Sequence, residues 1–318
     1  MKKKKVAISI GDLNGIGIQL ALENHQYVKK IVTPIYCIDQ SMLKQAADKL
    51  NLSIPNNFQT IEDVAPHFEI KPGKITKESG TYAYASFVKA VKMAKNDEIG
   101  ALTTLPIHKK SWELSGIKYK GHTDALRHFF NTEAIMMLGC PKMYVGLFTE
   151  HIPLGEVAGS IEEKKLTCFL VNFYKTAKPK STIAVLGLNP HAGDNGVLGN
   201  EEKIISKAID NATFIIKRSN PSLSTHHSLL FTKPMVPDVA FTPNVRKHYT
   251  HYVAIYHDQG LAPLKALYFD EGINVSLNLP ILRTSVDHGT AFDIAYKKGI
   301  ELNRLSYLNA IRYIVDNR

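Results

Sequence analysis

The chain has 318 residues, 44% of them hydrophobic and 21% charged, and this balance excludes wholesale disorder. Its formal net charge of +10 comes mainly from lysines scattered after Lys5, without the motif of a known nucleic-acid-binding module. No apolar run is long enough to predict a membrane span, and 3 distant cysteines without a CxxC pair favour a reducing cytoplasm.

Short apolar runs alternate with helical patterns, which predicts an α/β fold with mostly parallel strands. In the first half we expect strands over 6–10, 35–38 and 99–106, and helices over 41–51, capped by Ser41, and over 81–96. In the second half we expect strands over 143–149, 182–188 and 252–257, and helices over 161–177, 201–212, 290–299 and 305–318. Because no Pro/Gly/Ser-rich linker separates two halves, two domains would share the chain discontinuously.

Three histidines follow predicted strands. His151 lies in TEHIPL, His191 in LNPHAGDNG and His257 in YHDQGL. Ligands of open parallel sheets bind at the carboxyl ends of strands, and three imidazoles with one open position are typical of a catalytic divalent metal site. Each histidine taken alone can equally bond a nearby carbonyl. Asp258 is a candidate for orienting a ligand, whereas Asp238, near an expected strand start, is read as a turn-capping residue.

A second group of residues has the chemistry to hold an anion. His122 and Thr123 follow a glycine at a probable helix start, where exposed N–H groups suit an anion. Lys265, Asn274 and Arg283 supply cationic and polar groups that suit a phosphate or carboxylate. The alternative for Lys265 is a solvated helix face, and for Arg283 it is a surface ion pair.

The loop TSVDHGTAFDIA contains a third candidate site, at His288, Gly289 and Thr290. Such a turn can hold a nucleotide, although a Gly-Thr pair is also a common helix start. No GxGxxG follows a strand, and no GxxxxGK[ST] or GxSxG motif occurs. The residues alone therefore indicate an α/β enzyme with a metal site and an anionic substrate.

The ordered motifs GDLNGIG, PIHKKSWELSG, GHTDAL, TEHIPL, LNPHAGDNG, YHDQGLAPLK and INVSLNLPILRTSVDHGTAFDIA resemble the 4-hydroxythreonine-4-phosphate dehydrogenase family of the vitamin B6 pathway. The resemblance extends from about residue 6 to about residue 296. It implies the isocitrate/isopropylmalate dehydrogenase fold, with two α/β/α domains and a cleft between them. We place a terminal domain at about 1–125 plus 285–318, and a central domain with the metal ligands and dimer interface at 126–284.

The resemblance also implies roles for the candidate residues. His151, His191 and His257 match the family's metal ligands, in a site shared between the subunits of a homodimer. His122, Thr123, Lys265, Asn274 and Arg283 match its substrate-binding residues. The loop of His288, Gly289 and Thr290 matches the family's loop that contacts the adenosine of the cofactor. The expected cofactor is NAD, and NADP is the alternative. Zinc is the first choice of metal, and cobalt or magnesium are alternatives.

The first motif departs from the usual GDPAGIGPE of the family. Leu13 and Asn14 replace Pro and Ala, Ile18 and Gln19 replace Pro and Glu, and Asp124 stands where Glu is usual. These departures bear on the geometry of the first loop and on cofactor or substrate preference, because the metal and anion groups are retained.

The expected reaction is NAD-dependent oxidation of 4-phosphooxy-L-threonine to 2-amino-3-oxo-4-phosphooxybutanoate, which decarboxylates to 3-amino-2-oxopropyl phosphate. The metal would polarise the substrate hydroxyl, and Lys265 and Asp258 are weak candidates for the proton acceptor. One alternative is a sister metal-dependent NAD(P) dehydrogenase acting on another hydroxy acid. The other is a non-enzymatic, basic nucleic-acid-binding dimer. We expect a small phosphorylated substrate and neither a nucleic-acid nor a membrane partner.

Overall fold

The protein is described by a computed structural model that covers residues 3–224 and 229–317. The chain divides into two compact units, one formed by 1–134 and 270–318 and the other by 135–269. Within the described ranges, no helix is both long and apolar enough to cross a bilayer.

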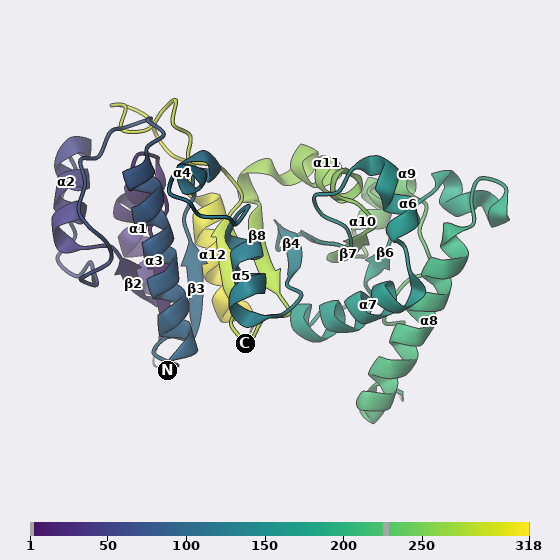
Figure 1. Ribbon diagram of the computed structural model, residues 1–318. Helices are drawn as coiled ribbons and strands as arrows, with labels where there is room; N and C mark the ends of the chain where they lie inside the picture. The colour runs from purple at the N-terminus through teal and green to yellow at the C-terminus, as the bar shows by residue number, and fades with distance from the viewer. Residues whose placement is uncertain (1–2, 225–228, 318) are drawn as a thin grey trace. The chain divides into compact units, whose positions relative to one another are not determined.

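The strands of the first unit lie in the order β2-β1-β3-β9-β8. Figure 1 labels β2, β3 and β8 among them. The strands β1 (Lys5–Ser9), β2 (Thr33–Cys37), β3 (Ala101–Thr104) and β9 (Arg283–Val286) are parallel, and β8 (Ile273–Leu277) is antiparallel to β9. The helices are α1 (Gly17–Ile31), α2 (Gln40–Leu50), α3 (Lys77–Lys95), α4 (Lys109–Leu114), α5 (His122–Phe130) and α12 (Leu305–Asp316).

Helices cover both faces of this sheet. Because successive strand residues point to opposite sides, each strand contributes side chains to both cores. In β1, Val6 and Ile8 pack in the core beneath α1, α2 and α12. Ala7, between them, packs on the opposite side with residues of α3, α4 and α5. The unit is therefore an α/β/α layer structure, and the near-continuous apolar sequence of β1 follows from its burial on both faces.

The second unit contains strands in the order β4-β5-β7-β6. The hairpin of β4 (Ile135–Cys140) and β5 (Met143–Leu147) is antiparallel, whereas β5, β7 (His251–Ala254) and β6 (Ala184–Val185) are parallel. The α-helices are α6 (Val157–Ser160), α7 (Glu163–Ala177), α8 (Glu201–Ser219), α9 (Pro237–Ala240), α10 (Pro243–Arg246) and α11 (His257–Tyr268). Short 3₁₀ turns include Leu154–Glu156, Pro190–Gly196 and Pro221–Ser224.

The unit boundaries differ from those expected at about 125/126 and 284/285. The breaks fall at 134/135 and 269/270, so that β8 belongs to the first unit. The physical reason is the β8–β9 hairpin: β9 pairs with β3, and β8 pairs with β9 from Ile273 to Ser276. Asn274 and Arg283 are thereby placed in the terminal unit.

The predicted helix over 290–299 is wrong, because this segment forms turns. Ala291, Tyr296 and Gly299 have φ values of 45°, 61° and 74°, which a right-handed helix cannot contain. The Tyr296 hydroxyl donates a hydrogen bond to the Leu13 carbonyl at 2.8 Å. A contact distant in sequence therefore overrides the local helical pattern.

Smaller expectations are also corrected. The N-cap of α2 is Asp39 rather than Ser41, and α3 begins at Lys77, after the cap Thr76, rather than at 81. The strand expected near Asp238 is absent from that segment, because Pro237 begins the short helix α9 there. Proline lacks the N–H that a strand ladder needs and suits the first turn of a helix.

Candidate functional site

The first unit contains a buried, positively charged side chain, the guanidinium of Arg283. Arg283 begins β9 and is only 3% exposed. Its guanidinium donates to Thr104 Oγ1 at 2.7 and 3.2 Å, to Ser276 Oγ at 3.2 Å and to Asn274 Oδ1 at 3.5 Å. Asn274 and Ser276 are two residues apart on β8, so both side chains lie on the same face of the sheet.

These partners are all uncharged. Burial lowers the pKa of Arg283 to about 9, because desolvation disfavours the charged form. Among the described residues, no carboxylate forms a hydrogen bond with this guanidinium. A buried charge is costly unless it is paired, so an anion beside this guanidinium would offset the cost of its desolvation.

The first turn of α5 borders the same polar group. Thr123 Oγ1 lies 3.3 Å from Ser276 Oγ. His122 lies against the rings of Phe87 and Trp112, with centroids 4.9 and 5.3 Å away. Burial, and then the charge of Arg283, lower the pKa of His122 well below its usual value. Its buried Nε2 has no hydrogen-bond partner among the described residues, as expected for an atom that a ligand satisfies.

The loop of His288, Gly289 and Thr290 follows β9 and packs against the first loop of the chain. Ile16 N donates to Thr290 O at 3.0 Å. A Cβ added to Gly15 would lie 2.8 Å from Thr290 O, so glycine permits this close approach. Gly289 itself is exposed, and a Cβ there would meet nothing within 4 Å. The loop is therefore fixed at the buried Thr290 and open to solvent at Gly289.

The second unit brings two of the three predicted metal ligands together. The ring centroids of His151 and His257 lie 5.6 Å apart. Two imidazoles this close can share one ion, at the usual Zn–N distance of about 2.0–2.1 Å, when a nitrogen of each ring faces the space between them. His257 Nδ1 lies 2.7 Å from Asp258 Oδ1, a contact that leaves Nε2 as the ligand atom. This pair of imidazoles suits a divalent cation. The contact with Asp258 can fix the orientation of the His257 ring.

His191 lies on the separate turn Pro190–Gly196 and is exposed. In the described part of the chain, no three His, Cys, Asp or Glu side chains come close enough to hold one metal ion. The backbone at His191 is unusual: the φ values from His191 to Asn195 are all positive, between 42° and 79°. Such strain costs about 1–2 kcal/mol per non-glycine residue and is concentrated at functional sites.

Lys265 lies on α11, also in the second unit, and is half-buried. Its Nζ lies 5.7 Å from the centroid of the Phe269 ring. The structure thus places Lys265 on a helix of the unit that carries the histidine pair, whereas His122, Thr123, Asn274 and Arg283 form one cluster in the other unit.

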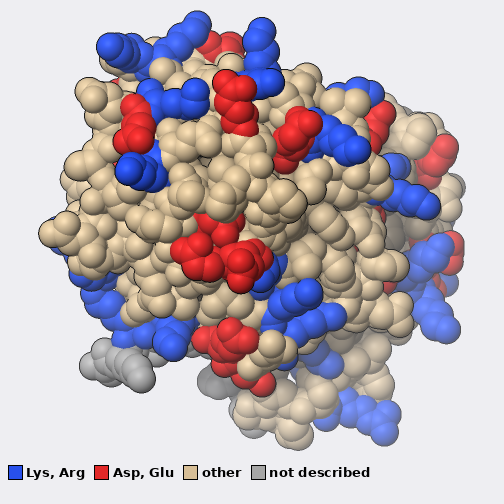
Figure 2. All heavy atoms as spheres, turned by 60° about the vertical axis from the view of Figure 1, so that its left-hand side comes forward, with Lys and Arg blue, Asp and Glu red and all other residues tan. Residues whose placement is uncertain are grey.

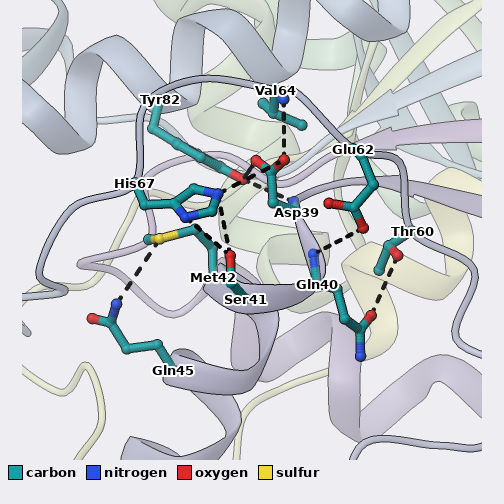
Figure 3. Close-up of polar contacts among 10 residues, drawn as sticks. All are labelled: Asp39, Gln40, Ser41, Met42, Gln45, Thr60, Glu62, Val64, His67 and Tyr82. Carbon is teal, nitrogen blue, oxygen red and sulfur yellow. Dashed lines mark hydrogen bonds and ion pairs between the residues drawn. The ribbon is translucent and has the colours of Figure 1, made fainter.

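A third polar cluster, at the end of β2, has the residue types of a nucleophilic triad without its geometry (Figure 3). Asp39 Oδ1 lies 4.0 Å from His67 Nε2, and Ser41 Oγ lies 3.1 and 3.2 Å from the two ring nitrogens of His67. The Asp39 carboxylate instead accepts bonds from the Tyr82 hydroxyl at 2.6 Å and from Val64 N at 3.2 Å. This cluster anchors the 58–70 segment and does not build a nucleophile.

Surface charge on the face drawn in Figure 2 is mixed. Lys and Arg side chains alternate with Asp and Glu side chains across this face instead of gathering into one basic patch. The basic side chains on the side of the molecule visible there are therefore interspersed with acidic ones.

Sequence reasoning identified Asn274 but missed the other two uncharged partners of Arg283, Thr104 and Ser276. Thr104 ends β3, and Ser276 follows Asn274 by two residues in β8. The period-2 alternation of a strand could have identified Ser276 once Asn274 was chosen, but the pairing of β3 with β9 leaves no local signal at Thr104.

Two α/β units with mixed sheets define this protein. One holds a buried guanidinium with only neutral partners and the other an imidazole pair, which suit a small anionic ligand and a divalent cation. Residues 30–314 match the family described as "Pyridoxal phosphate biosynthetic protein PdxA". The chain belongs to this family.

Similar proteins have consistent names. The 4-hydroxythreonine-4-phosphate dehydrogenase of Sulfurimonas denitrificans is 55% identical over 312 residues, covering 98% of this chain and 97% of that protein. The enzyme of the same name from Campylobacter fetus is 48% identical, covering 99% and 98%. The crystal structure of a 4-hydroxythreonine-4-phosphate dehydrogenase from Burkholderia phymatum has a TM-score of 0.78 at 29% identity, covering 98% and 97%.

Proposed function

We propose that this protein is an NAD-dependent 4-hydroxythreonine-4-phosphate dehydrogenase of pyridoxal 5'-phosphate biosynthesis. It oxidises 4-phosphooxy-L-threonine to 2-amino-3-oxo-4-phosphooxybutanoate, which loses CO₂ to give 3-amino-2-oxopropyl phosphate. Family membership and relatives of that name at 55% and 48% identity support this activity.

The observation that supports a phosphorylated substrate is the buried Arg283 with only neutral partners. A phosphate would supply the missing negative charge and accept charge-assisted hydrogen bonds, each worth about 1.5–3 kcal/mol. His122 is held neutral by burial, so its Nε2 adds a hydrogen-bonding atom without adding charge. Thr123 and Asn274 orient the ligand around the guanidinium.

The histidine pair would hold the cation, with His191 as the proposed third ligand. When bound, a divalent metal lowers the pKa of a substrate hydroxyl and stabilises enolate charge, and NAD accepts the two electrons of the oxidation. Asp258 keeps the His257 ring in one orientation through the 2.7 Å contact. Lys265 binds a carboxylate of the substrate or takes the hydroxyl proton, and the loop of His288 to Thr290 supports the adenosine. The homodimer and the cytoplasmic location stay predictions.

The test compares two substrates with and without phosphate. In an NADH-release assay, Arg283→Met should raise KM for 4-phosphooxy-L-threonine by about 100-fold, because at least two charge-assisted bonds are lost. The KM for unphosphorylated 4-hydroxythreonine should change by less than about 3-fold. Arg312→Met, on the exposed side of α12, is the matched control and should leave both values unchanged. Equal effects of Arg283→Met on both substrates would remove Arg283 from the phosphate site.

A further inference from the structure

Gln259 connects two of the histidine-bearing loops in the second unit. It lies two residues after His257, in the first turn of α11, and is 9% exposed. Its Oε1 accepts a bond from Ile255 N at 2.7 Å, and its Nε2 donates to Gly187 O at 2.6 Å. Ile255 follows β7 and precedes His257, whereas Gly187 follows β6 and precedes His191. One buried amide therefore spans the ends of two parallel strands.

The third histidine loop is attached at the same point. Thr149 follows β5 and precedes His151, and its backbone N and its Oγ1 both donate to Ile255 O, at 3.1 and 2.7 Å. Ile255 is thus held on both sides, by Thr149 through its carbonyl and by Gln259 through its N–H. The spacing between the His151 and His257 loops depends on these bonds.

The chain of bonds continues toward His191. Glu202 Oε1 accepts from Leu188 N at 2.8 Å and Asn189 N at 2.7 Å, directly after Gly187. A Cβ added to Gly187 would lie 3.1 Å from Glu202 Oε1, so the segment is packed closely against α8. Fixing residues 187–189 in this way sets where the strained turn at His191 begins.

We propose that Gln259 is a positioning residue that sets the relative placement of the histidine loops and thereby the affinity for the divalent metal. This inference rests on the proposed function, because it assumes that these histidines bind a metal. Gln259 acts through the backbone at Ile255 and Gly187, and touches neither substrate nor cofactor. Its amide can do what a carboxylate cannot, because it donates and accepts at the same time.

The experiment measures Co²⁺ binding to the full-length, metal-free protein by its visible absorption and by competition with a chelator. Gln259→Met has similar volume and loses both bonds, whereas Gln259→Glu keeps the acceptor for Ile255 N and loses the donor to Gly187 O. Both variants should bind Co²⁺ about 10- to 100-fold more weakly than the wild type, the usual effect of losing a residue that orients metal ligands. The absorption band should also change, since the ligand geometry is altered.

The matched control is Thr167→Val, which removes a buried hydroxyl on α7 whose hydrogen bond, 3.5 Å long, goes to Ala208 O on α8 and not to a histidine loop. It should keep wild-type Co²⁺ affinity, even if its thermal midpoint falls as much as that of the Gln259 variants. Wild-type affinity and spectrum in both Gln259 variants would overturn the inference while leaving the metal site intact. A wild type that binds Co²⁺ no better than His151→Ala would overturn the metal site itself, and this inference with it.

Discussion

Asn14 shows how one buried side chain can hold a loop. It is fully buried, its Oδ1 accepts from Lys71 N at 2.8 Å, and its Nδ2 donates to Lys74 O at 2.8 Å. Its own carbonyl accepts from Gly73 N at 2.8 Å. The residue that replaces the usual alanine of the motif therefore ties the segment before α3 to the first loop.

Asn14→Ala should lower the free energy of unfolding by about 1–3 kcal/mol, because the buried side chain loses its two hydrogen bonds to the backbone at Lys71 and Lys74. Urea denaturation measures this change. Asn14→Asp keeps the acceptor for Lys71 N but not the donor to Lys74 O, and we expect an intermediate loss. An alanine variant as stable as the wild type would show that the 71–74 segment is held by other contacts.

Among the elements, the loop that enters the turn at His191 depends on α8. Glu202, in the first turn of α8, accepts from two consecutive backbone N–H groups, at Leu188 and Asn189. Asn189 Nδ2 also donates to Glu202 Oε2 at 2.9 Å and to Glu201 Oε2 at 2.7 Å. The first turn of α8 thus holds the segment that leads into the left-handed turn just before this helix.

Glu202→Ala should speed the amide hydrogen exchange of Leu188 and Asn189 by roughly 10- to 100-fold, because each bond to a charged acceptor is worth about 1.5–3 kcal/mol. Exchange followed by NMR resolves the two amides. Glu163→Ala, which removes a carboxylate that accepts only from the Asn211 side chain in the bonds described, is the control. Unchanged exchange at both amides would contradict the role given to Glu202.

Much of this architecture is predictable from sequence because its elements are locally consistent. β1, β5, β7, α7, α8 and α12 follow apolar patterns that their burial explains. The turns at 290–299 are not predictable in this way, since the Tyr296–Leu13 bond joins residues 283 positions apart. Likewise, Arg283 could be chosen as an anion-binding residue, but its burial and its neutral partners arise from β3 and β8 pairing around β9.

For the whole molecule, buried neutral histidines make the free energy of unfolding depend on pH. Burial lowers the pKa of His251 to about 4 and that of His122 well below its usual value. The unfolded chain therefore binds more protons than the folded chain below about pH 6.5, so stability is full above that pH and falls as the pH is lowered.

His251→Gln should flatten this dependence. Between about pH 6.5 and 4, the wild type should lose up to about 1.4 kcal/mol per pH unit through His251, and the variant should lack that contribution. Urea denaturation at a series of pH values gives the two slopes. Parallel slopes for wild type and variant would show that His251 is not kept neutral by the fold.

The path of the chain through the first unit has a consequence for its synthesis on the ribosome. β3 pairs on one side with β1 and on the other with β9, which begins at Arg283. When residue 134 emerges, β3 is therefore an uncovered edge, and at about 5–20 residues per second its neighbour follows on the order of ten seconds or more later. The second unit is continuous in sequence. The segment translated in the middle can thus acquire its native structure first, and the N-terminal segment must avoid aggregation until the end of translation supplies the missing strands.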